Sequence, residues 1–513
     1  MKIKKLLALG LATAALTMTA CGKKNNDQEQ AVDIKGEYEV LVWCGEGTKE
    51  LTAEYIRKFE AANEGVTFKE TIEEVSEANA GTQMLTDIDA GADIYSFAQD
   101  QTARLIQGGA LAKLGKGAAK NVTEQNDEGS VKAVKSGDDL YAYPMTSDNG
   151  YFMYYDKSVI GDTDITDLDA LVTKCEQAGR NISYEFGSSG WYEVAPFFGN
   201  GCVSEWTTNS KGKFVSVKDT FNSEAGLAAA KAIQHMVQST THVDSSSAAD
   251  FTAGTKSAIV ISGTWNYENA KTALGENLGI AELPSMNIGG KKVHLGSFAG
   301  YKLIGVKPQS DVKRAAAFQK LAQFLTNKDA QLARFDLKGW GPSNKEAQQA
   351  EAVQASPALK ALKAQNQYST VQGQIHGSWW DIMKALATAI KAAKSDAELQ
   401  AALTVYDTAV KACVAENTSP WGLVGGFAAS NWSTNVDFAQ QDDGTWALDY
   451  TLAADDEFKV RKGTDWDTFN DLQLTLPEGK IEQKADGNLK CLVAGEYHFV
   501  VDGEAGTLVI TAK

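Results

Sequence analysis

Aromatic side chains at the ends of apolar runs are the residues of this chain best suited to bind a small molecule. The run 258–261 reads Ala-Ile-Val-Ile and is ended by Ser262 and Gly263, just before Trp265 and Tyr267. This composition predicts a short buried strand. Side chains just beyond the carboxyl end of such a strand line the crevice where ligands bind in open α/β sheets. The alternative interpretation is that both rings belong to the hydrophobic core.

Further aromatic residues occupy the same kind of position, near an expected strand end or a loop-helix junction. Their flat apolar faces match the C–H faces of a pyranose ring, whose hydroxyls can donate hydrogen bonds to carboxylates. The residue types therefore favour a carbohydrate ligand, although each ring taken alone could be part of the core. These residues are Trp43, Phe97, Trp191, Tyr192, Trp379 and Trp380.

The totals of the sequence exclude several classes of protein. A chain of 513 residues exceeds what one hydrophobic core usually supports, so two or three domains are expected. The net charge of −17 would repel a nucleic-acid backbone. The six cysteines and five histidines lack the spacing of a zinc site, so we expect neither a metal nor another cofactor. A disulfide between Cys175 and Cys202 is left open.

The beginning of the chain has the pattern of an export signal. Three lysines within residues 1–5 precede an apolar run over 6–16, which predicts a signal peptide over 1–20 rather than a spanning helix. The segment resembles a bacterial lipoprotein signal, which implies that Cys21 is lipidated and holds the protein on the extracellular face of the cell membrane. Residues 21–35 are then a flexible tether. The alternative is secretion with Cys21 as a free thiol.

Strands and helices are expected to alternate through the first four-fifths of the chain. This alternation predicts mainly parallel sheets with helices on both faces. The turn Gly45-Glu46-Gly47 lacks the third glycine of a dinucleotide-binding loop. The expected strands are 38–43, 66–72, 93–98, 140–144, 151–155, 182–186, 258–261 and 300–306, and the main expected helices are 80–90, 167–178, 225–237 and 312–325.

The character of the chain changes abruptly at residues 417–420. The segment 421–513 has no long helical pattern and contains short alternating runs separated by turns rich in glycine and aspartate. This pattern predicts a separate all-β sandwich.

The order of motifs from Tyr38 to about Val414 resembles the extracellular solute-binding proteins of ABC sugar importers, most closely their maltose and maltodextrin binders. The resemblance implies two α/β lobes joined by a hinge, and delivery of the ligand to separate permease subunits. The motifs are Val42-Trp43, Asp93-Ile94, Ala142-Tyr143-Pro144, Tyr154-Tyr155-Asp156-Lys157, Ile261-Ser262-Gly263-Thr264-Trp265 and the turn Gly339 to Ser343.

Within a solute-binding domain over 36–416, each lobe is expected to be discontinuous. Lobe one would comprise about 36–146 and 297–340, and lobe two about 147–296 and 341–416. Strands on both sides of Asp148 would then belong to different lobes.

The resemblance also implies particular polar groups in the cleft between the lobes. Glu46 and Asp100 fall near acidic residues that bind sugar hydroxyls in the maltose binders, and Asp148 falls where a hinge-side glutamate is found. Basic residues of those proteins are displaced to Lys49 or replaced by Gln101, so the identity of the sugar stays open.

Aromatic positions complete the predicted cleft. Trp191 with Tyr192 stands in place of an aromatic pair, and Trp265 and Trp380 match two stacking tryptophans of the maltose binders. The predicted sugar-binding residues are therefore Trp43, Glu46, Phe97, Asp100, Asp148, Trp191, Tyr192, Trp265, Tyr267, Trp379 and Trp380.

The segment 421–513 resembles the starch-binding modules of gut bacterial starch-capture lipoproteins and of some amylases and pullulanases. The resemblance rests on runs such as Asn431-Trp432, Phe458-Lys459-Val460-Arg461 and Asp465-Trp466. It implies that α-glucan is bound by Trp432, Lys459, Trp466 and Asn470, while Trp446 belongs to the core. The alternative is an immunoglobulin-like spacer with buried tryptophans.

The leading hypothesis is a monomeric, lipid-anchored binding protein that captures maltodextrins and is not an enzyme. The sequence has no Gly-x-x-x-x-Gly-Lys-Ser/Thr loop, so transport would use a separate ATPase. A starch-degrading glycosidase would need two carboxylates at a fixed separation, and no spacing singles out such a pair. A third alternative is an adhesin for insoluble starch, which needs only the segment 421–513.

Overall fold

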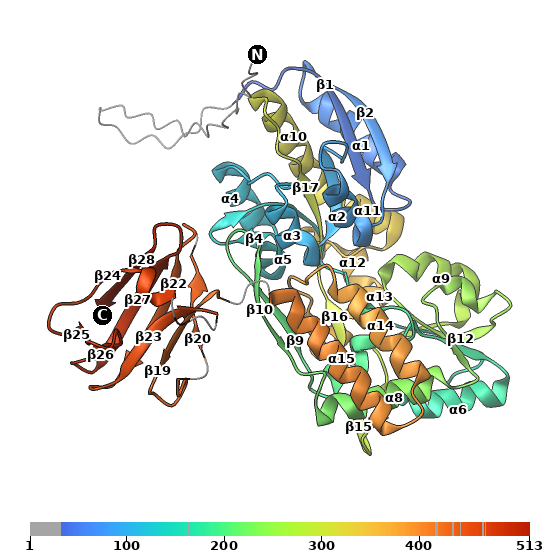
Figure 1. The fold of residues 1–513 in the computed structure, drawn as a ribbon. Coiled ribbons are helices and arrows are strands. Elements are labelled where there is room, and N and C mark those ends of the chain that lie inside the picture. The colour runs from blue at the N-terminus through green and yellow to red at the C-terminus, as the bar shows by residue number, and fades with distance from the viewer. Residues whose placement is uncertain are drawn as a thin grey trace, which may run out of the picture.

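The computed structural model describes residues 32–161, 165–415, 419–432, 435–441, 443–463, 466 and 468–513. Two α/β lobes form the part before residue 416, and a β sandwich follows (Figure 1). Cys21, the predicted signal peptide and most of the predicted tether lie outside the described residues. Within the described ranges, no helix combines the length and the apolar character needed to cross a membrane.

The first lobe is built on a five-stranded sheet in the order β2-β1-β3-β17-β6. Its parallel strands are β1 (Gly36–Cys44), β2 (Val66–Glu74) and β3 (Ile94–Ala98), while β17 (Lys302–Val306) runs antiparallel to both β3 and β6 (Tyr143–Thr146). Its helices are α1 (Lys49–Ala62), α2 (Glu77–Thr86), α3 (Thr102–Gln107), α4 (Lys116–Gln125), α5 (Glu128–Ala133), α10 (Val312–Leu325) and α11 (Lys328–Lys338).

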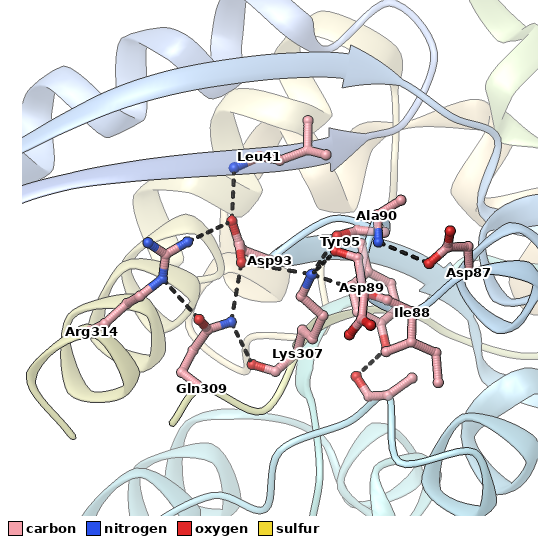
Figure 2. A network of polar contacts seen from close by, with 12 residues as sticks. Leu41, Asp87, Ile88, Asp89, Ala90, Asp93, Tyr95, Lys307, Gln309 and Arg314 are labelled. Atoms are coloured by element: carbon pink, nitrogen blue, oxygen red, sulfur yellow. Dashed lines mark hydrogen bonds and ion pairs between the residues drawn. The ribbon is translucent and has the colours of Figure 1, made fainter. Parts of the chain in front are cut away.

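A charged network holds this sheet to helix α10 (Figure 2). The carboxylate of Asp93, just before β3, accepts hydrogen bonds from the Leu41 amide at 3.0 Å and from Arg314 Nη2 at 3.2 Å. Its other oxygen accepts from Gln309 Nε2 at 3.1 Å. The ammonium of Lys307 donates to the carbonyls of a neighbouring turn, with the shortest distance, 2.6 Å, at Gly91. The network therefore joins β1, β3, the end of β17 and α10, so the Asp93-Ile94 motif has a structural role.

The second lobe has a sheet in the order β11-β8-β12-β7-β13. Every residue of its central strand β12 (Ser257–Ser262) is buried, as its apolar composition predicts. The other strands are β7 (Phe152–Asp156), β8 (Asn181–Ser183), β11 (His242–Val243) and β13 (Leu278–Ala281), and the larger helices are α6 (Leu168–Ala178), α7 (Gly190–Gly199), α8 (Glu224–Val237), α9 (Tyr267–Leu274), α12 (Glu351–Ala355), α13 (Pro357–Gln365), α14 (Trp379–Ala392) and α15 (Asp396–Ala415).

Smaller strand pairs extend the second lobe. One hairpin, β9 (Ser204–Thr208) with β10 (Phe214–Asp219), reaches toward the first lobe, and a second consists of β14 (Ser285–Ile288) and β15 (Lys291–His294). A parallel pair, β16 (Ser297–Ala299) with β18 (Ser369–Val371), lies on the path of the chain toward β17.

The prediction of mainly parallel sheets was wrong in one respect, because half of the strand pairings in each large sheet are antiparallel. Strand β7 runs against β12, and β17 runs against β3. Both strands follow a crossing between the lobes, so each enters its sheet from the border where the parallel strands end. A strand that enters from that border must run in the opposite direction to its neighbours.

Three crossing segments are hydrogen-bonded side by side between the lobes. The Ser147 amide donates to the Gly341 carbonyl at 2.9 Å, and the Asn149 amide donates to the Gly300 carbonyl at 3.2 Å. Thr146 also forms an antiparallel bridge with Pro342. The predicted two-lobe fold with a hinge is confirmed, while the numbers given above for the lobe boundaries stay predictions.

The C-terminal part consists of two five-stranded sheets that share one core. Their orders are β20-β19-β23-β26-β25 and β21-β22-β27-β28-β24. Residues from both sheets, such as Leu423, Phe458 and Phe499, pack together in this core, as a β sandwich requires. The strands are β19 (Trp421–Gly425), β20 (Val436–Asp437), β21 (Ala439–Gln440), β22 (Trp446–Leu452), β23 (Glu457–Lys462), β24 (Gln473–Thr475), β25 (Ile481–Gln483), β26 (Leu489–Cys491), β27 (Gly495–Asp502) and β28 (Thr507–Ala512).

Candidate functional site

Asp148 lies at the centre of the border between the lobes. Its Oδ2 accepts hydrogen bonds from Thr264 Oγ1 at 2.5 Å and from the Gly341 amide at 2.8 Å. The Asp148 carboxylate thus connects the first segment that crosses between the lobes to the end of β12 and to the turn after α11. Its Oδ1 is buried and has no hydrogen-bond partner among the described residues.

Trp265 lies beside Asp148, in the short 3₁₀ turn that follows β12. A Cβ added to Gly263 would come within 2.1 Å of the indole ring, so only glycine lets the ring lie against the backbone there. The ring is half-buried, and the ammonium of Lys302 in β17 lies 5.5 Å from its centroid. Trp265 therefore lies at the border, where a strand of lobe one meets the end of a strand of lobe two.

A second tryptophan, Trp340, completes this part of the border. The Lys302 Nζ lies 3.9 Å from the centroid of its indole ring. A Cβ on Gly45 would lie 2.8 Å from the Trp340 ring and 2.2 Å from Glu77 Oε1, so these two side chains meet at the turn after β1. Glu46, the next residue in that turn, is exposed.

Sequence reasoning did not single out Lys302, Trp340 or Glu77. Two signals were available: a lysine within the apolar strand 300–306, and a tryptophan bounded by Gly339 and Gly341. Neither signal indicates which residues from other parts of the chain lie beside these side chains.

Another group of aromatic residues lies at the junction of α7, β16 and α14. The rings of Trp191 and Phe298 are stacked, with centroids 5.2 Å apart and planes 26° apart. Trp380 packs edge-on against Phe298 at 6.3 Å. Trp191 and Trp380 are both half-buried, so each keeps some indole surface accessible.

Asp100 lies beside Trp380 and follows directly after β3. Burial raises the pKa of its carboxyl to about 6, while the nearby Arg104 guanidinium and a hydrogen bond from Trp380 act in the opposite direction. Asp100 belongs to lobe one, whereas Trp380 begins α14 in lobe two. The pair therefore joins a carboxylate from one lobe to an indole from the other.

Three aromatic residues predicted to line the cleft are instead buried in the two cores. Phe97 has no exposed surface and packs against Tyr95, with ring centroids 5.5 Å apart. Trp379 is equally buried, and its Nε1 donates a hydrogen bond to Tyr406 Oη at 2.9 Å. Tyr192 is buried against Tyr151 at 4.7 Å. These side chains offer a ligand no accessible face in this conformation, because their elements are covered by neighbouring elements.

The two remaining aromatic predictions, Trp43 and Tyr267, differ in position. Trp43 is buried, and its Nε1 donates to Glu73 Oε2 at 2.9 Å, which directs the indole to the neighbouring strand β2. Tyr267 is half-buried, and its ring lies 3.6 Å from where a Cβ on Gly339 would be. Tyr267 therefore lies at the border near Trp265, whereas Trp43 belongs to the core of lobe one.

In the β sandwich, Trp432 and Trp466 form a pair with ring centroids 6.3 Å apart. Trp466 is 42% exposed, and the Arg461 guanidinium lies 4.3 Å above its ring. Arg461 Nε also donates to Asn435 Oδ1 at 2.8 Å. Arg461 was not predicted as a site residue, although it belongs to the motif that suggested Lys459.

Lys459 and Asn470 are less closely tied to this pair. The Lys459 ammonium lies 5.7 Å from the ring of Phe469. Asn470 lies in the 3₁₀ turn Thr468–Asp471, and its side chain is outside the described residues. Trp446 packs partly buried against the sandwich core.

Two further features lie away from the border. A surface hollow of about 920 Å³ on lobe two is bordered by Asp167, Lys292 and Lys231, and Lys292 forms an ion pair with Asp167 at 3.1 Å.

The thiols of Cys175 and Cys202 are both free and buried, so they form no disulfide. Burial raises their pKa values to about 12 and about 11. No group of three potential metal ligands occurs within the described ranges.

Comparison with known proteins places this architecture in a family. A galactooligosaccharide-binding protein from Bacillus subtilis (strain 168) is 24% identical over 387 residues, which cover 70% of this chain and 85% of that protein. A solved structure with acarbose is 30% identical over 74% of this chain and 99% of its own, with a TM-score of 0.64. A maltodextrin-binding protein from L. casei BL23, solved without ligand, is 23% identical over 74% and 100% of the two chains, with a TM-score of 0.61. Residues 54–361, more than half of the chain, match the family described as bacterial extracellular solute-binding protein, and the chain therefore belongs to that family.

Proposed function

We propose that this protein binds maltodextrins outside the cell and delivers them to separate ABC permease subunits. The observation that carries the proposal is the set of half-buried tryptophans beside buried carboxylates at the lobe border. Trp265 directly follows Thr264, which donates a hydrogen bond to Asp148, and Trp380 lies beside Asp100. Indole faces stack on the C–H faces of glucose rings, while carboxylates accept hydrogen bonds from the hydroxyls. Closure of the lobes on a sugar would give the permease a form to recognise.

The names and titles of the relatives support an oligosaccharide as the ligand, but they differ in which oligosaccharide they name. The names and titles of the proteins compared mention maltodextrin, galactooligosaccharide and acarbose. A galactooligosaccharide is therefore the second candidate ligand. The resemblance of the C-terminal segment to starch-binding modules favours α-glucans, because a module on the same chain would concentrate the ligand of the cleft.

Calorimetry with the full chain tests the ligand. Maltotetraose and maltose are titrated alongside galactooligosaccharides and xylo-oligosaccharides. We expect saturable binding of the maltodextrins and none of the xylo-oligosaccharides. Binding of galactooligosaccharides alone would replace the proposed ligand, and no heat with any maltodextrin would overturn the proposal.

We further propose that the β sandwich binds starch through Trp432 and Trp466, with Lys459 and Asn470 as additional contacts. The exposure of Trp466 and its closeness to Trp432 support this proposal, because helical α-glucan presents several glucose faces at once. An immunoglobulin-like spacer would instead bury its tryptophans, as Trp421 is buried here.

A lipid anchor and the absence of catalysis complete the proposal. Cys21 would be lipidated and would hold a monomeric protein at the cell membrane, which suits a family of extracellular proteins. Labelling of cells with a radioactive fatty acid tests this anchor, with Cys21→Ser as the unlabelled control.

A glycosidase would release reducing ends from amylose, and we expect none from this protein.

A further inference from the structure

The Lys302 side chain is largely buried at the lobe border, and its ammonium has no protein acceptor among the described residues. Lys302 is 6% exposed, and its Nζ lies 3.9 Å from the ring centroid of Trp340 and 5.5 Å from that of Trp265. Among the described residues, its Nζ makes no hydrogen bond and no ion pair. An ammonium in such a site keeps little contact with water, so a bound group that accepts its hydrogen bonds would be favourable.

Buried polar atoms around Lys302 also lack partners. Glu77 Oε1 and Asp148 Oδ1 are acceptors without donors among the described residues, and Trp340 Nε1 is a donor without an acceptor. The hydroxyl of Thr146, which pairs with Lys302 across β17 and β6, is unpartnered as well. Most buried polar groups in proteins are hydrogen-bonded, so several unpartnered ones in one place indicate that water molecules or the hydroxyls of a ligand satisfy them.

The backbone brings these atoms to one location. Thr146 forms a bridge with Pro342, two residues after Trp340. The neighbouring Gly341 donates its amide to Asp148, and the Gly45 turn holds Trp340 against Glu77. The cation, both carboxylates and both indoles therefore surround a single part of the border.

We propose that Lys302, Glu77 and Trp340 form a further sugar subsite, in which vicinal hydroxyls of one glucose ring bridge the ammonium and a carboxylate. This inference rests on the proposed binding of maltodextrins. A hydroxyl can accept a hydrogen bond from Lys302 and donate one to Glu77 at the same time. An anionic ligand would satisfy the ammonium but would be repelled by Glu77 and Asp148, so a neutral polyol fits this set of groups better.

Lys302→Met distinguishes this subsite from a purely structural role. Methionine keeps the apolar stem between the two indoles but removes the charge and the donors. We expect the ligand-free full chain to keep or raise its melting temperature, because the substitution removes a largely buried charge that has no protein acceptor. Affinity for maltotetraose should fall about tenfold or more, as for loss of a hydrogen bond to a charged group.

A structural cation held between two rings would give the opposite pattern, with a lower melting temperature and unchanged affinity, and this result would overturn the subsite. Glu77→Gln, which removes the charge, and Trp340→Phe, which removes the indole N–H and part of the ring system, should also weaken binding. Lys360→Met removes a lysine from the surface of lobe two and should leave affinity unchanged. If the wild-type chain binds maltotetraose and Lys302→Met binds it equally well, only the subsite fails. If the wild-type chain binds no maltodextrin, both proposals fail.

Discussion

At the scale of single residues, burial decides which of the acidic groups can change its charge near neutral pH. Asp100 is almost fully buried beside Trp380, and its pKa is raised to about 6 by that burial. A free aspartate has a pKa of about 3.9. The folded protein therefore holds a proton on Asp100 between about pH 4 and pH 6, where the unfolded chain does not.

This difference predicts two opposite effects of pH. The stability contributed by Asp100 is fully present below about pH 4 and is lost as the pH rises through 6, by on the order of 1 to 3 kcal/mol. Affinity for maltotetraose should instead fall several-fold as the pH drops below 6, because protonation turns one carboxyl oxygen into a donor and removes the charge that strengthens hydrogen bonds from sugar hydroxyls. Calorimetry and thermal unfolding at pH 4.5 and pH 7 measure both effects.

Asp100→Asn is the matched control, because the amide keeps the shape of the side chain and does not titrate. We expect its stability and its affinity to vary less with pH than those of the wild type. Identical pH profiles for the two proteins would show that Asp100 is not the titrating group.

At the scale of elements, the tip of the hairpin β9–β10 in lobe two contacts lobe one. Ser136 Oγ of lobe one donates a hydrogen bond to the Ser210 carbonyl at the hairpin tip, at 3.1 Å. A Cβ on Gly212 would lie 2.1 Å from the Ala103 carbonyl oxygen of lobe one. The tip therefore fits closely against lobe one only because residue 212 is a glycine.

Gly212→Ala should prevent this close contact and weaken maltotetraose binding several-fold. Gly212 has φ of +78°, so alanine also adds backbone strain of about 1 to 2 kcal/mol. Gly201→Ala supplies a control for strain alone, because Gly201 has φ of +81° and no atom within 4 Å of the added Cβ. Thermal unfolding should show similar losses of stability in both variants, whereas calorimetry should show weaker binding only for Gly212→Ala. Equal affinities would mean that this contact does not contribute to closure.

At the scale of the whole molecule, two tryptophan sites lie on separate folded parts of one chain. The β sandwich is separate from the two lobes (Figure 1). Trp265 follows β12 at the lobe border, whereas Trp432 and Trp466 belong to the β sandwich. Each part has its own hydrophobic core, so a change in one part need not disturb the other.

Single substitutions should therefore separate two binding activities. Trp265→Ala should reduce affinity for maltotetraose by about 1 to 3 kcal/mol, from lost apolar burial and stacking, while binding to starch granules stays unchanged. Trp466→Ala should reduce granule binding and leave maltotetraose affinity unchanged. Calorimetry and sedimentation with granular starch measure the two activities. A Trp466→Ala protein that still binds granules as the wild type does would indicate a spacer rather than a starch-binding module.

By itself the sequence determined the fold class, because strand periodicity and motif order are properties of short segments. The alternation of expected strands and helices and the abrupt change near residue 417 were sufficient to predict an α/β part and a β sandwich, whereas the two lobes were implied by the resemblance of the motif order to solute-binding proteins. These signals were not sufficient to predict strand direction in each sheet, because direction depends on where the chain re-enters a lobe after crossing the border.

Only the tertiary structure decided which side chains remain accessible at the lobe border. Phe97 and Trp379 have the same local sequence signals as Trp265 and Trp380, yet both are fully buried. Lys302 has neighbours from segments about forty residues away on either side, and Glu77 is more than two hundred residues away in sequence. Burial and the lack of a polar partner depend on such distant neighbours, and no local pattern of residues records them.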